Sequence, residues 1–446
     1  MDYQSNTEYV FIPFSYNDER VFLPLVRKVE DSGLWDPVQD KFAYLLKYVA
    51  NKMDSNNREN CQCFHFILKD SSRERCGLGG AEDWFLTERK HSFGGNKERI
   101  RFQIMGTQLF CFSSTVGILA FQLRMERDDP FWISHALYHL KKVSRAYVFQ
   151  ESLGGEARTT LTEMAGRILK EYETASPVEL FYFADPIQAR ANVLTFLEVH
   201  SQEDYRKELF YLRHCYGERF PYFEDRKAEE KEIANYTTNV TWGVTSEALV
   251  ALACPDNGQE DFVRKRFYNN FNTEYLFMYV LLLHQKFVLY LFLTRIDMKT
   301  CDNLESLEKY RRELYAFETN FVFSRVTEVP QYRDLYDKVV EAFALDKMYQ
   351  DVREPLVSLR ELRREAVEKE RDKREDKVNK ALLLLSILSV FSALTDSYHA
   401  AEEICGLLHV DNAVRAVQVV VILAIFVVGF FVLKNLVGNK KENSEE

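Results

Sequence analysis

Two long apolar runs lie close together near the end of this chain, Ala381–Thr395 and Ala416–Leu433. The second holds eighteen residues with Gln418 as its only polar side chain, close to the twenty or so that cross roughly 30 Å of hydrocarbon. The first carries three serines and reaches that length only if Asp396 and residues 397–401 are included. The pattern predicts two membrane-spanning helices, the first with a carboxylate near its end.

The region before the first run predicts one long helix. From Leu356 to Thr395 there is neither Gly nor Pro, which allows a rod of about 60 Å at 1.5 Å per residue. Pro355 stands where the first turn of a helix accepts a proline. Between Arg360 and Lys380 the chain has nine Lys/Arg and seven Asp/Glu, which is typical of a solvated helix with ion pairs four residues apart. We therefore expect a charged stalk that continues into the first span, over residues 356–401.

The first part of the chain alternates short strand-like and helix-like stretches. Runs rich in Phe, Ile and Val, several with period-2 alternation, predict strands at Tyr9–Pro13, Cys61–Leu68, Ile100–Met105, Gln108–Ser113, Val116–Leu123 and Val178–Phe183. Helices are predicted at Phe131–Tyr147 and Glu156–Tyr172. The fold class is therefore α+β with membrane helices, and residues 1–255 form an N-terminal α/β domain.

Residues 256–355 predict a helical region that follows the sheet. Its expected helices are Glu274–Arg295, Leu304–Arg325 and Gln331–Met348. The first of these is apolar enough to resemble a third span, but its centre reads His284-Gln285-Lys286. Because a lysine at the bilayer midplane is costly, we interpret this segment as a buried helix, with a third span as the alternative.

Basic residues predict how the chain crosses the membrane. The stalk is rich in Lys and Arg, and three lysines follow the second run, whereas the connecting segment 402–415 has Arg415 as its only strong base. By the positive-inside rule both termini are cytoplasmic, residues 402–415 form an external loop and residues 434–446 form a cytoplasmic tail.

Composition narrows the choice of activity. The formal net charge of −10 argues against nucleic-acid wrapping, so no direct nucleic-acid partner is expected. Eight scattered cysteines predict free thiols in a reducing cytosol. The group Cys61-x-Cys63-x-His65 alternates like a strand and has no second close pair, so a core strand is favoured over a zinc site. The glycine-rich Cys76–Gly80 lacks the lysine of a phosphate-binding loop and predicts a flexible turn. We predict no enzymatic activity.

The order of these elements resembles the CorA family of divalent-cation channels and transporters. In that family a cytoplasmic α/β domain and long helices precede an uninterrupted stalk, a first span, a short acidic external loop, a second span and a basic tail. Five subunits assemble with the first span lining the pore, which implies a homopentamer in the cell inner membrane. The family's Gly-Met-Asn signature is absent, because the corresponding stretch reads Leu394-Thr395-Asp396-Ser397-Tyr398. Magnesium selectivity therefore does not carry over.

CorA-like proteins without this signature include a branch encoded with type III CRISPR systems. These are membrane effectors proposed to respond to a nucleotide messenger such as an adenylated S-adenosylmethionine. The chain is similar to that branch in its missing signature and its large, aromatic-rich cytoplasmic part. The resemblance implies a ligand-gated channel in antiviral defence with no covalent cofactor. The alternatives are a constitutive transporter of Mg²⁺ or another divalent cation, and a membrane-anchored binding or scaffold protein.

Helical angles place six residues of the first span and its approach on one stripe about 100° wide. The stripe consists of Asn379, Leu382, Ser386, Ser389, Ala393 and Asp396. Around a symmetric ring it gives hydroxyls within the membrane, Leu382 as a hydrophobic constriction and Asp396 as a carboxylate ring that favours cations. Close helix packing through small residues is the alternative, which Asp396 on the same side disfavours.

Acidic residues beyond the first span predict an external mouth. Glu402, Glu403 and Asp411 could concentrate cations there, although ordinary solvated acids are an equal alternative. For a cytoplasmic ligand, two segments offer stacking and phosphate pairing: Asn239–Ala251 with Trp242-Gly243, and Phe210–Phe223 with Arg213, His214 and Arg219. Core packing is the favoured interpretation of each single residue, so no ligand-binding or metal-binding residue is assigned.

Overall fold

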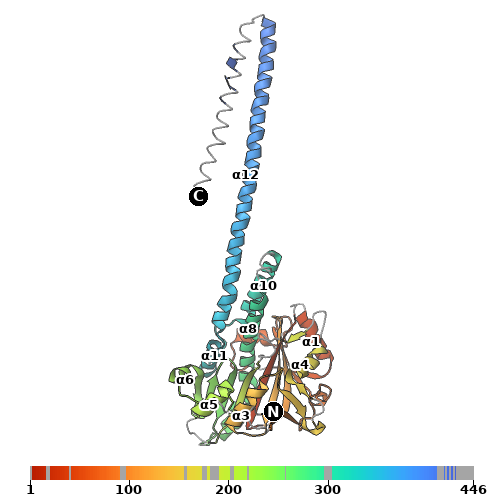
Figure 1. The fold of residues 1–446 in the computed structure, drawn as a ribbon, viewed down its shortest axis with the longest axis vertical. Helices are drawn as coiled ribbons and strands as arrows, with labels where there is room; N and C mark the ends of the chain where they lie inside the picture. Colours follow the sequence, from red (N-terminus) through yellow and green to blue (C-terminus); the bar gives the residue numbers. More distant parts are fainter. Residues whose placement is uncertain are drawn as a thin grey trace. The chain divides into compact units, whose positions relative to one another are not determined.

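The computed structural model divides the chain into two compact units, Met1–Leu356 and Val357–Glu446 (Figure 1). The structure describes residues 3–16, 21–39, 42–90, 97–154, 158–172, 178–180, 190–200, 205–217, 220–256, 258–295, 304–408, 416, 419–420, 423–424 and 427. The first unit is an α+β sheet domain. The sequence sets residues 256–355 apart as a helical region, and in the structure they belong to this same unit.

A sheet of thirteen described strands forms the centre of the first unit. Ten of them follow the order β11-β12-β13-β10-β1-β6-β5-β4-β7-β8, with β2, β3 and β9 paired at its side. The described pairs are antiparallel except β10 with β13. The strands are β1 (Asn6–Tyr16), β2 (Trp35–Pro37), β3 (Cys63–Leu68), β4 (Trp84–Lys90), β5 (Lys97–Phe112), β6 (Val116–Met125), β7 (Tyr147–Gln150), β8 (Thr159–Thr160), β9 (Val178–Leu180), β10 (Asn192–Glu198), β11 (Ile233–Thr237), β12 (Val240–Val244) and β13 (Ala248–Ala253).

Each predicted strand overlaps an observed strand, but the predicted bounds of one strand pair and of one helix are wrong. The segments predicted as two strands from Ile100 to Ser113 form the single strand β5, because a register shift between Ile104 and Gly106 lets its pairing with β6 continue. The helix predicted to reach Tyr147 is too long. Helix α3 ends at Leu140, and Tyr147 begins β7.

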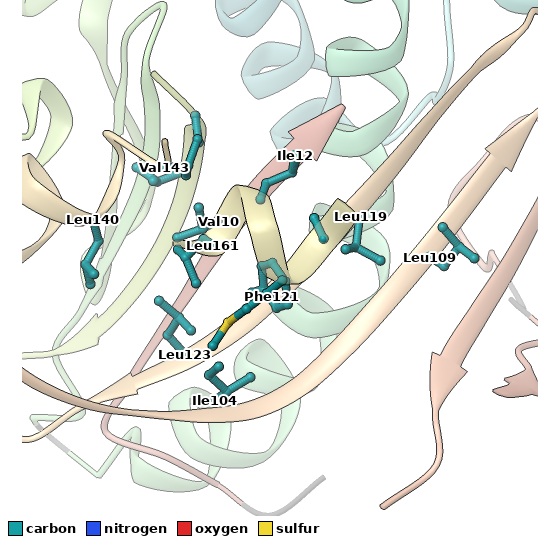
Figure 2. Close-up of a cluster of buried hydrophobic side chains, with 14 of the residues drawn as sticks. Val10, Ile12, Ile104, Leu109, Leu119, Phe121, Leu123, Leu140, Val143 and Leu161 are labelled. Atoms are coloured by element: carbon teal, nitrogen blue, oxygen red, sulfur yellow. The ribbon is translucent and has the colours of Figure 1, made fainter. Parts of the chain in front are cut away.

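Helices cover both faces of the sheet (Figure 1). One face packs against α1 (Phe22–Asp31), α3 (Pro130–Leu140), α4 (Leu161–Lys170) and α5 (Arg206–His214). Figure 2 shows Val10, Leu123 and Ile104 of three neighbouring strands gathered with Leu161 of α4. The remaining helices include α2 (Lys47–Met53), α6 (Arg226–Glu232), α7 (Tyr268–Asn270), α8 (Leu276–Arg295), α10 (Leu304–Phe321) and α11 (Pro330–Phe343). Because helices cover both faces, the central strands β1, β6 and β10 are buried along nearly their whole length.

Helix α8 packs on the opposite face and has a polar centre. The ring of Tyr279 in α8 contacts the ring of Phe11 in β1, and the two ring centroids are 5.5 Å apart. His284 is fully buried, stacks on Phe112 at 3.9 Å between centroids and shares a short hydrogen bond with the Ser114 hydroxyl. Burial lowers the pKa of His284 well below its ordinary value, so the ring is neutral.

The next two polar residues of α8 also have partners in the sheet domain. Gln285 Nε2 donates to the carbonyl of Phe321 at 2.7 Å. Lys286 Nζ donates to Asn192 Oδ1 and to the Ser246 carbonyl, each at 3.2 Å. Burial lowers the pKa of Lys286 to about 8, against an opposing effect of the Glu247 charge. With 78% of its most apolar window buried, α8 is a core helix, and this prediction is confirmed.

Helix α12 (Leu345–Leu408) begins well before the predicted stalk. Helix α11 ends where Ala344 adopts a left-handed φ of 53°, and α12 starts directly afterwards, with Leu345 and Val352 buried in the sheet domain. Pro355 therefore lies inside a helix, and its predicted place in the first turn is wrong. Because proline has no N–H, the carbonyl of Asp351 cannot receive the usual helical bond from this position. The expected unbroken helix from Leu356 to Thr395 is confirmed.

Strand β1 carries a carboxylate into the core. Glu8 is fully buried, and neither of its oxygens has a hydrogen-bond partner of ordinary geometry among the described groups. The nearby amide of Met125 donates to Asn6 Oδ1 at 2.7 Å instead. Burial, followed by the charge of Asp128, raises the pKa of Glu8 well above its ordinary value. Glu8 therefore keeps its proton in the folded domain at pH values where an unfolded chain loses it.

Glu198 of β10 is buried with the opposite result. Arg264 donates to both of its oxygens, from Nε at 3.0 Å and from Nη2 at 2.7 Å. Burial on its own would raise the pKa of Glu198, but hydrogen bonds from Arg264 and Tyr3 lower it on balance. This carboxylate is therefore charged and paired in the folded domain.

We predict that Glu8→Gln raises the melting temperature of the protein at about pH 7.5 and that this gain shrinks as the pH is lowered. Above the ordinary pKa of a glutamate the unfolded chain releases the Glu8 proton while the folded domain holds it, so the stability of the wild type falls as pH rises. The measurement is thermal unfolding of the full chain in detergent across neutral and mildly acidic pH. Glu198→Gln is the matched control and should lower the melting temperature, because it removes the charge that Arg264 pairs. Similar shifts in both variants would contradict the assignment.

Candidate functional site

The apolar part of α12 is exposed along its described length. By length and composition Val367–Ala400 could cross a membrane, and none of its most apolar window is buried. The side chains of Leu384, Leu385 and Leu388 are 60%, 60% and 63% exposed. Exposed apolar surface of this extent marks contact with a membrane or another protein. In the described part of the chain α8 is the other helix that is long and apolar enough, and it is buried.

The charged part of α12 precedes this surface and holds the ion pairs that the sequence predicts. Arg364 pairs with Glu368 at 3.0 Å and Arg371 with Glu375 at 2.9 Å, and a third pair joins Lys380 to Asp376. All are four residues apart on exposed positions. Pairs of this kind stabilise a solvated helix by a few tenths of a kcal/mol each, about 0.2–0.5.

The predicted pore stripe lies entirely on exposed positions of α12. These residues are Asn379, Leu382, Ser386, Ser389, Ala393 and Asp396. Because the helix is unbroken, the angles that place them on one side hold. Ser386 Oγ donates to the Leu382 carbonyl at 2.9 Å, and Ser397 Oγ donates to the Ala393 carbonyl at 2.7 Å. Such bonds satisfy a hydroxyl within its own helix.

The predicted external mouth is described only in part. Glu402 and Glu403 lie on the last turns of α12 and are exposed, whereas the sequence places them in a loop. Asp411 and most of the second predicted span, Ala416–Leu433, lie outside the described residues.

A metal centre finds no support in the described part of the chain, where no three His, Cys, Asp or Glu side chains lie close enough to hold an ion. Cys63 and His65 belong to β3, as the strand interpretation predicts. His65 Nε2 shares a hydrogen bond with Gln108 Oε1 at 2.9 Å and its ring stacks on Phe110.

The two segments considered for a ligand pocket contribute mainly to the core. Trp242 of β12 is buried against Tyr275, with ring centroids 4.7 Å apart. A Cβ on Gly243 would lie 2.7 Å from Leu209 Cδ1, so glycine allows α5 to pack closely there. Arg213 is buried and donates to Glu232 at 2.7 Å. Arg219 lies outside the described residues.

A buried arginine fixes the glycine-rich loop that precedes β4. The guanidinium of Arg73 donates to the carbonyls of Gly79 and Gly80, each at 3.2 Å, to Met105 at 3.1 Å, and to Ile104. The sequence predicts a flexible turn, and in the structure two of these bonds reach the loop while the other two reach β5, so Arg73 links the loop to that strand. A sequence motif could not reveal this, because Met105 and Ile104 come from a different strand.

A cavity of about 850 Å³ lies beside this loop. Three basic side chains line it, Arg158, Arg167 and Lys170, together with Gly77 and Gly79 and the rings of Phe85 and Phe149. Guanidinium and ammonium groups are the usual protein partners of phosphate, and a cavity of this size admits a nucleotide.

The carboxylates at this cavity are largely engaged with the protein. Asp83 accepts from the amide of Gly80 at 2.6 Å and from Gln150 Nε2 at 2.7 Å. Glu163 accepts from the amide of Thr160 at 3.0 Å in the capping box that begins α4. Glu74 is the third acid of the lining. Backbone and side-chain amides therefore donate hydrogen bonds to two of the three acids that line this cavity together with the bases.

We predict that Gly79→Ala destabilises the loop by roughly 2–4 kcal/mol, the sum of a left-handed backbone and a disturbed Asp83 bond. Gly79 has a φ of +63°, and an added Cβ would lie 2.7 Å from Asp83 Oδ2. Gly154→Ala is the matched control, with a φ of +64° and nothing within 4 Å of the added carbon. Urea unfolding of both variants measures the difference. Equal losses of unfolding free energy in the two variants would show that the contact with Asp83 adds no cost.

Comparison with known proteins finds no family model that matches the chain, no curated protein that resembles it and no matching solved structure.

Proposed function

We propose that this chain forms a two-span, homopentameric ion channel of the inner membrane, with both termini cytoplasmic, and that a small ligand bound by its sheet domain controls conduction. The observation that carries the proposal is the difference between the two apolar helices. Helix α8 is buried, whereas none of the most apolar window of α12 is buried. A surface of this kind needs lipid or neighbouring subunits to cover it.

The composition of α12 supports a conducting path. By helical angles, the side of α12 opposite the predicted stripe is apolar. It carries Leu384, Leu388 and Phe391, whereas the stripe carries Ser386, Ser389 and Asp396. In a ring of identical helices one side then meets lipid, while the other supplies hydroxyls and a carboxylate to a shared water-filled axis.

The cavity beside the glycine-rich loop supports control by a ligand with phosphate groups. Its bases suit phosphate. The first turns of α12 belong to the sheet domain, where Leu345 and Val352 are buried. A ligand that binds one conformation of this domain more tightly shifts its population, and the start of α12 shifts with it. A nucleotide messenger of the adenylated S-adenosylmethionine type is the ligand we propose.

Lysine substitutions on adjacent positions of α12 test which side meets lipid. Leu388→Lys should sharply reduce the protein recovered in membranes, because a lysine at the bilayer centre costs about 2.5–3.5 kcal/mol. Ser389→Lys should remain in the membrane, because that position faces the water-filled axis, and should reduce cation flux. Membrane fractionation and liposome flux are the two measurements. Equal loss of both proteins from membranes would contradict the assignment of sides.

Neutral substitutions of carboxylates test the conduction path. We predict that Asp396→Asn lowers cation conductance and selectivity in a reconstituted bilayer, because it removes a ring of charges from the axis. Glu402→Gln, on a later turn of the same helix, should have the smaller effect. Unchanged conductance and selectivity in Asp396→Asn would remove this residue from the path.

Liposome flux of the purified oligomer, with and without candidate nucleotides, tests the whole proposal. Flux that requires a nucleotide supports it. Nucleotide-independent flux of Mg²⁺ or another divalent cation would instead indicate a constitutive transporter, and no flux under any condition would indicate a membrane-anchored binding or scaffold protein.

A further inference from the structure

A small cavity of about 260 Å³ lies where the turn between β5 and β6 meets the last turns of α8 and the second half of α10. Much of its lining is apolar and buried. Leu291 and Phe292 of α8 are 8% and 6% exposed, and Phe317 of α10 is 2% exposed. An apolar cavity of about 150 Å³ holds a benzene molecule, so this one admits a single ring or a short alkyl chain. It is smaller than the usual site of a drug-sized ligand, which begins at about 300 Å³.

The turn between β5 and β6 supplies hydroxyl groups to this cavity. Ser114 and Thr115 both line it. Thr115 has a φ of 71°, a left-handed backbone that a β-branched residue rarely adopts. The amide of Tyr16 donates to the Thr115 carbonyl at 3.0 Å and so helps to hold the turn in this form. Unfavourable backbone of this kind is concentrated at binding and active sites.

A buried histidine determines which atom Ser114 offers to a ligand. His284 is fully buried and neutral, and its Nε2 shares a hydrogen bond with Ser114 Oγ. Its other ring nitrogen, Nδ1, has no hydrogen-bond partner of ordinary geometry among the described groups. Because a buried N–H without a partner is rarer than a buried acceptor without one, the ring proton is assigned to Nε2, which donates to Ser114 Oγ. The hydroxyl hydrogen of Ser114 then remains for another acceptor.

The charges of the lining balance. In the described part of the chain its charged side chains are Arg295 and Glu313, one of each sign. Glu313 also lies 3.7 Å from the ammonium of Lys309. The other polar groups are the turn hydroxyls and the amides of Gln62 and Asn320. An ion that entered the apolar part would lose its hydration without a dedicated counter-charge, so this lining favours an uncharged ligand.

We propose that this cavity binds a small uncharged molecule that carries one hydroxyl or carbonyl oxygen on an apolar body, such as an aromatic or short-chain alcohol. The oxygen accepts a hydrogen bond from the Ser114 hydroxyl, and the apolar body packs on Leu291, Phe292 and Phe317. A bound ligand thereby connects the β5–β6 turn to α8 and α10. The inference concerns binding alone and does not rest on ion conduction.

Photolabelling of the full chain in phosphatidylcholine nanodiscs tests the proposal. The probe is a diazirine derivative of benzyl alcohol, and mass spectrometry locates the labelled residues. We expect label on the segments that carry Leu291 and Phe317, and we expect excess benzyl alcohol to remove it. Benzoate is the charged competitor of the same size and should need at least a roughly tenfold higher concentration. Label that maps only outside the cavity, or equal competition by benzoate, would overturn the proposal.

Loss of the turn hydroxyl tests the hydrogen bond. Ser114→Ala should weaken competition by benzyl alcohol roughly two- to tenfold, because the ligand oxygen loses its donor. Toluene has the same ring without the oxygen, and its competition should stay within about twofold of the wild type. An equal change for both competitors, or no change for either, would overturn the assignment of the ligand oxygen to Ser114.

A larger side chain in the lining locates the site independently of that hydrogen bond. Ala316 of α10 lines the cavity, and Ala316→Leu should reduce the specific label at least roughly tenfold by filling the space. Thr319→Leu is the matched control, because Thr319 lies on the same helix but is exposed and outside the lining. Melting temperatures establish that each variant folds. If Ser114→Ala does not fold because His284 loses its acceptor, the Ala316 variant still decides. Full labelling in folded Ala316→Leu would overturn the proposal.

Discussion

Hydrogen bonding at the centre of α8 determines which apolar helix belongs to the core of this protein. His284, Gln285 and Lys286 follow one another, and each has a partner in the sheet domain. A buried polar group without a partner costs about 1–3 kcal/mol, so these bonds favour one position of α8 on the sheet. None of the most apolar window of α12 is buried, and the proposal that this helix spans a membrane rests on that contrast.

Two larger cavities give the sheet domain chemically different surfaces. The one beside the glycine-rich loop is lined by three bases and three acids, and Arg73 binds two carbonyls of its loop and two of β5. The other cavity, of about 630 Å³, lies among α5, α6 and strands β11 to β13. There the buried carboxylate of Glu229 lies next to the guanidinium of Arg206, and Leu209 and Leu252 contribute apolar surface. They lie at opposite ends of the strand order, with the buried pair β1 and β10 between them.

The sequence predicts the strands well because the alternation of their apolar residues is a local property. It predicts α8 as a buried helix because the polar residues His284 to Lys286 stand at its centre. It does not predict where α12 begins. The turn before that helix depends on Ala344 in a left-handed conformation that glycine or asparagine usually adopts, and the preference of proline for a first turn does not exclude Pro355 from an interior. The pore stripe follows from helical angles and stays a prediction. The sequence does not predict the full lining of either of these two cavities, because folding alone brings Gly79 near Arg167, and Glu229 near Leu252. The segment Asn239–Ala251, considered for a ligand pocket, does supply Asn239 and Thr241 to the cavity that Glu229 lines.

Pro355 makes the resistance of α12 to bending vary along its length. An α-helix resists bending because every turn is tied to the next by backbone hydrogen bonds, and α12 lacks one such tie at the carbonyl of Asp351. The proline follows the buried Val352 by less than one turn and stands next to the boundary between the two compact units. Pro355 is therefore the position, close to the buried Val352, where α12 lacks one backbone hydrogen bond and where bending of the helix costs the least.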